Sequence, residues 1–191
     1  MRLLALPALA LFLGTAAQAQ TIELYGGTIA GPSQLDYGPL PSNPPTIPWD
    51  MDAGLVAGGG WYVGLPGGFE IGVDAMTTSR DYTGQPSTIS TQSLMLAGRM
   101  QFPNMQMGGV TPYAGLGVGM INVHYSDPTS TFLNGSDLVA GYQAEIGTRF
   151  NLTSNMGAFV AMKYQATFDD PVIQTEYVEY QSLSIIGGVR W

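Results

Sequence analysis

The feature that most constrains the fold is the alternation of apolar and polar residues over residues 137–151. One parity of this segment is apolar, apart from Thr148, and the other carries Gln143, Glu145 and Arg149. Successive side chains of a β-strand point to opposite faces of the sheet, so the pattern predicts a strand with one apolar face and one charged face. A slip of one residue would move Glu145 and Arg149 together onto the apolar side, so the register is strongly specified.

Seven further segments alternate in the same way and are separated by residues that favour turns. The sequence predicts eight strands, near residues 21–30, 51–64, 69–79, 91–102, 110–125, 137–151, 156–168 and 179–191. The connections are short at 65–68, 103–109 and 152–155, and longer at 31–50, 80–90, 126–136 and 169–178. Short turns at one rim and long loops at the other are typical of transmembrane β-barrels, in which the short turns face the periplasm.

The ionisable residues of these strands fall on the polar faces, and their signs nearly balance. The acidic members are Glu23, Asp52, Glu70, Asp74 and Glu145, and the basic members are Arg99, Arg149, Lys163 and Arg190. A basic side chain on the lipid face costs about 2–4 kcal/mol at the bilayer midplane. Total stability is only about 5–15 kcal/mol. We therefore expect the charged faces to line a narrow lumen, where the side chains can pair.

Periodicity alone does not say which face points inward, because a soluble lipocalin-like barrel would bury its apolar face. Only 10% of the residues are charged, whereas a soluble surface carries roughly 25–35%. A membrane helix over residues 53–69 is an alternative, but the segment is too short and contains Gly58, Gly59, Gly60 and Pro66. The sequence therefore predicts an all-β fold, an eight-stranded antiparallel up-and-down transmembrane β-barrel.

Aromatic residues are expected in two belts, one at each end of the strands, as at the two interfaces of outer-membrane barrels. The short-turn belt would contain Trp61, Phe69, Phe102, Tyr113, Phe150 and Trp191. The long-loop belt would contain Trp49, Tyr82, Tyr125, Phe168, Tyr177 and Tyr180.

Residues 1–19 have the features of a signal peptide: a positive charge at Arg2, an apolar run over residues 3–13, and small residues at Ala17 and Ala19. We expect cleavage after Ala19, which leaves residues 20–191 as one barrel domain. The net charge of −8, without a basic stripe, argues against a nucleic-acid partner.

The final strand, which ends on Trp191, resembles the closing strand of bacterial outer-membrane barrels, whose last aromatic residue is part of the assembly signal. Residues 112–119 (PYAGLGVG) and 140–155 (AGYQAEIGTRFNLTSN) also resemble the eight-stranded superfamily that contains opacity-type and OmpA/OmpX-type barrels. The resemblance implies a Gram-negative outer-membrane location, contact with lipid and lipopolysaccharide, and insertion by the barrel assembly machinery. Members include adhesins, membrane-integrity proteins and small-solute channels, so the resemblance specifies architecture rather than activity.

The first functional hypothesis is a monomeric surface or structural protein, with a role in adhesion or membrane integrity, whose long loops contact an unidentified extracellular ligand. These loops are acidic, with Asp36, Asp50, Asp81, Asp127, Asp169, Asp170, Glu176 and Glu179 against Arg80. A solvated anionic rim is the simpler interpretation, and no loop has EF-hand spacing. The second hypothesis is a narrow channel for small or apolar solutes. The lumen of an eight-stranded barrel is filled by side chains, so we expect no large pore, no cofactor and no metal.

The third hypothesis is a hydrolase, because His124-Tyr125-Ser126 resembles the His-x-Ser of lipid A deacylases. A nucleophilic serine needs a base beside it and an acid that orients the base. Glu145 lies on the opposite face, however, and Asp137 has lumen parity at the edge of a loop. An interfacial histidine beside Tyr125 is the simpler interpretation, and no catalytic residue is assigned.

Overall fold

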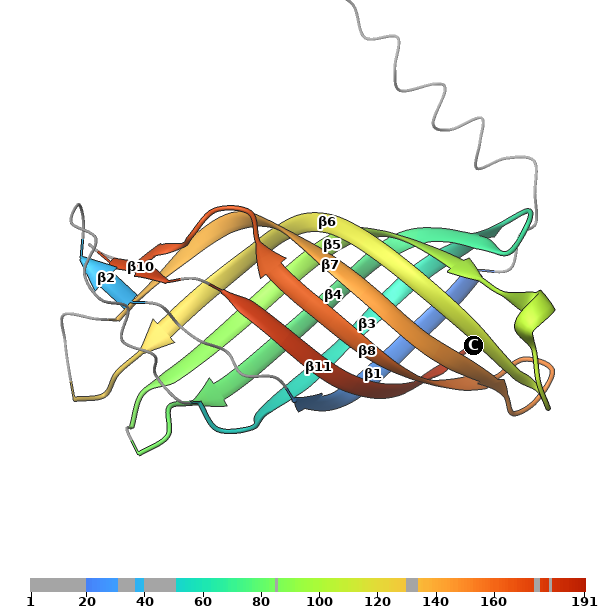
Figure 1. Cartoon of the computed structure of the whole chain (residues 1–191), viewed down its shortest axis with the longest axis horizontal. Coiled ribbons are helices and arrows are strands. Elements are labelled where there is room, and N and C mark those ends of the chain that lie inside the picture. The colour runs from blue at the N-terminus through green and yellow to red at the C-terminus, as the bar shows by residue number, and fades with distance from the viewer. Residues whose placement is uncertain are drawn as a thin grey trace, which may run out of the picture.

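The structure is a computed structural model that describes residues 20–30, 37–39, 51–84, 86–129, 134–173, 176–178 and 180–191. Within these residues, eight antiparallel strands close into a barrel (Figure 1) in the order β1-β11-β8-β7-β6-β5-β4-β3. The strands are β1 (Gln20–Ile29), β3 (Gly54–Leu65), β4 (Phe69–Asp81), β5 (Thr88–Gln101), β6 (Val110–Ser126), β7 (Gly135–Asn151), β8 (Gly157–Thr167) and β11 (Gln181–Arg190). Neighbours in the barrel are neighbours along the chain, and β1 pairs with β11. The predicted up-and-down barrel is confirmed.

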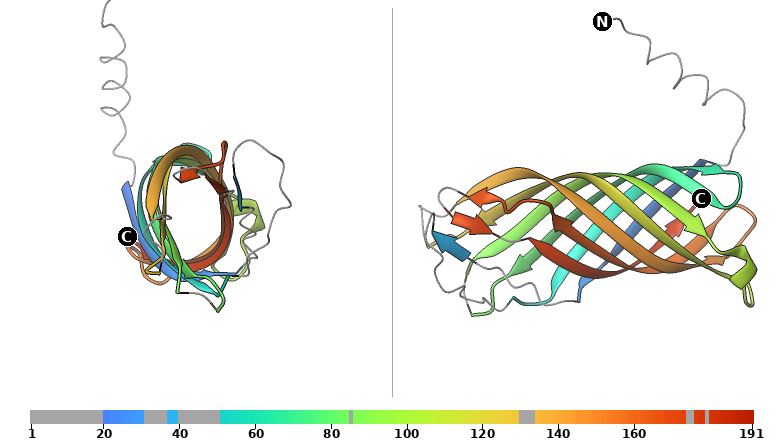
Figure 2. Two further views of the ribbon diagram at one scale, coloured as in Figure 1. Left: turned by 90° about the vertical axis from the view of Figure 1, so that its left-hand side faces the viewer. Right: turned by 45° about the horizontal axis from the view of Figure 1, so that its top comes forward.

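The apolar faces of the strands point outward, as the membrane interpretation requires. Leu116, Ile146 and Leu94 are 71%, 65% and 60% exposed on the outer wall. The view along the barrel axis shows the closed ring of strands (Figure 2, left). No helix among the described residues is long and apolar enough to cross a membrane. Residues 53–69, the helical alternative, form β3 and the start of β4.

Local backbone chemistry explains the short turns. Gly67 and Gly68, between β3 and β4, have φ of +84° and +82°, and Gly109, before β6, has φ of +83°. Only glycine adopts such angles without strain. In the turn between β7 and β8, the Thr153 hydroxyl accepts the backbone N–H of Met156 at 3.0 Å. The short 3₁₀ helix η1 (Pro103–Met105) and the C-terminus lie at this end of the barrel (Figure 1).

The long-loop end differs from the prediction in two ways. The connection expected over residues 80–90 is shorter, because β4 continues to Asp81 and β5 begins at Thr88, whose hydroxyl donates to Asp81 at 2.7 Å. A small sheet also joins two long loops through β2 (Tyr37–Pro39), β10 (Glu176–Val178) and β9 (Val172–Ile173). These strands have two or three residues each, too few for alternation to reveal them.

The aromatic belts are only partly as predicted. Trp61, Phe69, Trp191 and Phe168 are 40%, 48%, 48% and 60% exposed on the outer wall. Three tyrosines assigned to the belts instead lie buried inside the barrel: Tyr82, Tyr113 and Tyr180. Burial suits Tyr113 and Tyr180 because their hydroxyl groups donate to Glu145 and to Ser182, and the ring of Tyr82 packs edge-on against Tyr125. Trp49 and the side chain of Tyr177 fall outside the described residues, as does the predicted signal peptide.

Candidate functional site in the barrel lumen

Eight of the nine charged residues predicted to line the lumen point into the barrel. They come from six strands: Glu23 from β1, Glu70 and Asp74 from β4, Arg99 from β5, Glu145 and Arg149 from β7, Lys163 from β8, and Arg190 from β11. Seven of these side chains are at most 5% exposed, and that of Arg190 is 18% exposed. Four carboxylates therefore meet four cations in a space from which solvent is almost excluded.

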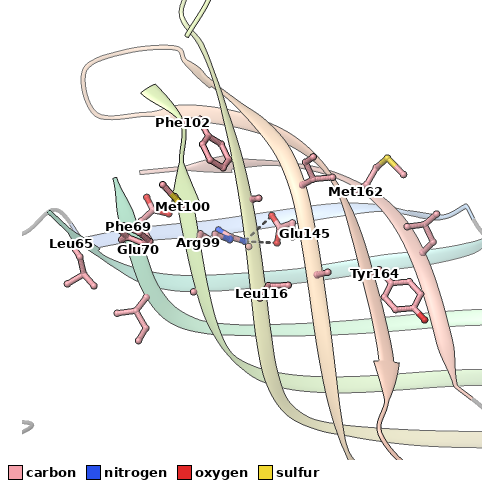
Figure 3. A pocket seen from close by; sticks show the side chains of 17 residues that line it. Leu65, Phe69, Glu70, Arg99, Met100, Phe102, Leu116, Glu145, Met162 and Tyr164 are labelled. Atoms are coloured by element: carbon pink, nitrogen blue, oxygen red, sulfur yellow. Dashed lines mark hydrogen bonds and ion pairs between the residues drawn. The ribbon is translucent and has the colours of Figure 1, made fainter. Parts of the chain in front are cut away.

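Arg99 lies at the centre of the network and bridges two carboxylates. Its Nη1 lies 2.5 Å from Glu23 Oε2, and its Nη2 lies 3.0 Å from Glu145 Oε2 (the contact drawn in Figure 3). The guanidinium also stacks on the ring of Tyr62, 3.9 Å from its centroid. Tyr113 donates its hydroxyl to Glu145. Arginine suits this position, because its planar group can satisfy two carboxylates and an aromatic face together.

A second group surrounds Asp74, further toward the long loops. Lys163 Nζ lies 2.8 Å from Asp74 Oδ1 and 3.3 Å from Glu145 Oε2. Tyr25 and Tyr62 donate their hydroxyls to the same aspartate, at 2.9 and 3.0 Å. Three donors thus compensate a carboxylate with no solvent exposure, as a buried charge requires.

A third group lies at the short-turn end. Arg149 makes two parallel hydrogen bonds to Glu70, at 2.9 and 2.6 Å, and Arg190 donates to the same carboxylate at 3.1 Å. Beyond it opens a polar pocket of about 430 Å³, lined by both arginines and by the turn that contains Thr153 and Asn155. Two cations of the third group, Arg149 and Arg190, therefore line this pocket.

The long-loop half of the lumen contains mostly uncharged side chains, and Arg80, near the end of β4, is the charged side chain described below. Gln165 donates to Gln143 at 3.1 Å and to Ser93 at 3.0 Å, and the hydroxyls of Thr78 and Thr91 lie 2.7 Å apart. An apolar cluster follows, made of Tyr82, Ile89, Met95, Ile121, Val123, Ile173 and Tyr180. We refer to these seven residues as the upper cluster. Ile173 belongs to β9, so a loop residue helps to close this end of the barrel.

Two sequence-based assignments need correction. Asp52, expected in the lumen, precedes β3 and is exposed, and its Oδ1 accepts the hydroxyl of Thr83 at 2.9 Å. Arg80, expected in a loop, is 6% exposed within β4, and its Nε donates to the backbone oxygen of Asp52 at 2.9 Å. The reason is that β4 extends two residues further than predicted, so that position 80 falls on an inward-facing parity. The upper cluster was not predicted, because Tyr82, Ile89 and Ile173 fall in segments that the sequence assigned to loops.

The possible hydrolytic residues do not form a catalytic arrangement. His124 is exposed on the outer wall and is paired across the sheet with Ser90 and Ser136. The carboxylate of Asp137 instead accepts the backbone N–H groups of Leu138 and Val172, at 2.9 and 2.8 Å. Among the described residues, no group of three or more His, Cys, Asp or Glu side chains could hold a metal ion.

Comparison with known proteins gives the same architecture. A family model described as the outer membrane protein beta-barrel domain matches residues 4–186. Neisserial surface protein A shares the fold with a TM-score of 0.61 and 12% identity, over 90% of this chain and 94% of that one. OprG from Pseudomonas aeruginosa gives 0.60 and 14%, over 91% and 95%. A major outer membrane protein from Thermus thermophilus gives 0.50 and 11%, over 91% and 98%. No curated protein sequence matches the chain.

Proposed function

The chain belongs to the outer membrane protein β-barrel family and is located in the bacterial outer membrane, and from this premise we propose that it is a surface or structural protein with a closed lumen. In this proposal the barrel anchors the protein in the membrane. The extracellular loops make the contacts with a partner that serve adhesion or membrane integrity. The short turns then face the periplasm and the long loops face outward. Trp191, at the end of the closing strand, serves as part of the signal that the barrel assembly machinery reads.

The observation that carries this proposal is that two barriers in series fill the lumen. Ion pairs around Arg99 occupy the periplasmic half, and the upper cluster occupies the extracellular half. An eight-stranded barrel has an interior just wide enough for side chains. A solute would have to displace both the paired charges and the packed apolar cluster. The lumen is therefore poorly suited to transport.

The extracellular loops are the remaining surface for a function. Exposed carboxylates lie there at Asp81, Asp169 and Asp170, and Asp36, Asp50 and Glu179 fall outside the described residues. The small sheet of β2, β10 and β9 ties the first long loop to the last. Loops with such internal pairing can present a defined surface to a partner, next to the headgroups of lipopolysaccharide.

Two experiments test the proposal. Purified protein in planar lipid bilayers should show no stable porin-sized conductance, and such a conductance would refute the closed lumen.

The second experiment uses a deletion strain, complemented either with the wild-type chain or with a chain whose loops 31–50 and 169–178 are shortened. The two strains should be compared for adhesion and for detergent sensitivity. Loop-dependent defects support the surface role, and full function of the shortened chain contradicts it.

A narrow passage for small solutes is the second candidate, and the polar periplasmic pocket beside Arg149 and Arg190 favours it. Single-channel recordings and liposome swelling with small solutes distinguish it from the first proposal.

A hydrolase that uses His124 and Ser126 is a third candidate, which rests on the sequence motif alone. Equal lipid A deacylation by wild-type and Ser126→Ala protein, or no deacylation by either, eliminates it.

A further inference from the structure

The outer wall of the barrel is hollowed across β4, β5, β6, β7 and β8 (Figure 3), with a volume of about 810 Å³. Two rows of cross-strand neighbours line this groove. The first row runs from Phe69 through Met100, Ala114 and Ile146 to Met162. The second row lies two residues away along each strand and runs from Ile71 through Gly98, Leu116, Ala144 and Tyr164 to Leu183 of β11. We refer to this hollow as the wall groove.

Small residues create the wall groove. Gly98, Ala114 and Ala144 form its floor, whereas Leu116 and Ile146 project beside them and are 71% and 65% exposed. A Cβ atom added at Gly98 would meet no atom within 4 Å. The space above this glycine is therefore open, and it is bounded by apolar side chains on both sides.

The path of the wall groove follows from the strand register. Phe69 is the first residue of β4, at the periplasmic end, whereas Met162 lies in the middle of β8. Four strand spacings of about 4.8 Å separate them, a path of about 19 Å. With strands tilted by about 40°, this path climbs about 12 Å, close to half of a hydrocarbon core about 30 Å thick. The groove thus leads from the periplasmic interface toward the bilayer midplane.

The chemistry of the wall groove is that of hydrocarbon. Glu70, Arg99 and Glu145 border it, but their side chains point into the lumen, where they are ion-paired. The hydroxyl of Tyr164 donates to Gln181 at 3.1 Å. A hollow without convergent polar groups does not hold ordered water. It is continuous with the outer wall that meets lipid, so its occupant must be apolar.

From this path and this lining, we propose that the wall groove is a lipid-binding site that holds one acyl chain of a phospholipid of the periplasmic leaflet. The headgroup lies at the interface beside Phe69 and Phe102, and the chain runs over Gly98, Ala114 and Ala144 toward Met162. The small residues allow the chain to lie against the backbone, and the flanking side chains slow its exchange with the surrounding lipid.

Photolabelling tests this site. The protein is reconstituted in vesicles of phosphatidylethanolamine and phosphatidylglycerol that contain a phospholipid with a diazirine on its acyl chain, and labelled residues are identified by peptide mass spectrometry. Label should concentrate on β5 to β8. In the Gly98→Leu variant, which fills the floor, the excess label in this region should fall to the level of the rest of the wall.

The matched control is Gly26→Leu, an exposed glycine of β1 outside the groove, where an added Cβ makes only an ordinary contact of 3.6 Å. Heat-modifiable migration and circular dichroism establish that both variants are folded. Label spread evenly over the wall, or equal in the two variants, overturns the proposal. A dimer in vesicles that Gly98→Leu dissociates also overturns it, because the occupant would then be a second copy of the chain.

Discussion

Lys163 and Asp74 lie 2.8 Å apart in the middle of the barrel, and neither side chain has any solvent exposure. The two residues are separated by 89 positions in the sequence. Buried ion pairs are poor sources of net stability, but a partner left alone is costly because its charge remains in a medium that cannot solvate it.

Lys163→Met should therefore destabilise the barrel by about 3–5 kcal/mol. Asp74 would retain the hydroxyls of Tyr25 and Tyr62 but would lose its nearest cation, which leaves Arg99 at 3.8 Å. Urea unfolding in lipid vesicles measures the change. The double variant Lys163→Met, Asp74→Asn should recover much of the loss, since no unpaired charge remains. A single variant as stable as the wild type would contradict this account of the network.

Tyr113→Phe should cost about 1–3 kcal/mol, because it removes a hydroxyl donor from a buried carboxylate, Glu145. The comparison variant is Tyr142→Phe, on the outer wall, where the ring packs against Phe168 and Tyr164. That change should stay within about 0.5 kcal/mol. The free energy of unfolding of both variants is measured in the same urea-unfolding experiment. Equal losses of stability in the two variants would mean that the inward position of Tyr113 is unimportant.

Ile146→Arg should destabilise the protein by about 2–4 kcal/mol, since the outer wall at the middle of β7 faces acyl chains. Leu152→Arg, in the turn beyond β7, should cost about 0–1 kcal/mol, because that position lies near the interface. Unfolding in vesicles of defined thickness measures both. Similar losses of stability in the two variants would contradict the depths in the bilayer that are assigned to Ile146 and Leu152.

The two barriers in the lumen should act in series. Arg99→Ser weakens the barrier in the periplasmic half by removing its central cation, and Ile173→Gly with Tyr180→Ala opens the upper cluster. Each change alone should leave single-channel conductance at the wild-type level, while the combination should produce discrete openings. Conductance in Arg99→Ser alone would show that the upper cluster does not close the barrel.

How much of this structure could be predicted is clear from Glu145 and its neighbours. Its parity on β7 is a local property, and it predicted correctly that the side chain points inward. The same holds for the eight barrel strands, whose boundaries lie within a few residues of those predicted. By contrast, Asp52 and Arg80 were placed wrongly, because the strand ends differ from those predicted: β3 begins at Gly54, beyond Asp52, and β4 continues past Arg80 to Asp81.

The partners within the lumen could not be predicted in the same way. Arg99 meets Glu23 from 76 positions away, and Tyr113 reaches Glu145 instead of the lipid interface. Which side chains share a level of the barrel depends on the stagger with which the eight strands close, and that stagger is a property of the whole sheet. The upper cluster depends in addition on a loop that folds back over the barrel end.

The sequence by itself determined a membrane barrel with an apolar wall and a charged interior, because the two-residue period of a strand makes one face lipid-compatible and the other not. The tertiary structure decided which charges pair, that tyrosines complete the network, and that side chains fill both halves of the lumen. These depend on distances between strands remote in the chain, and only ring closure sets those distances.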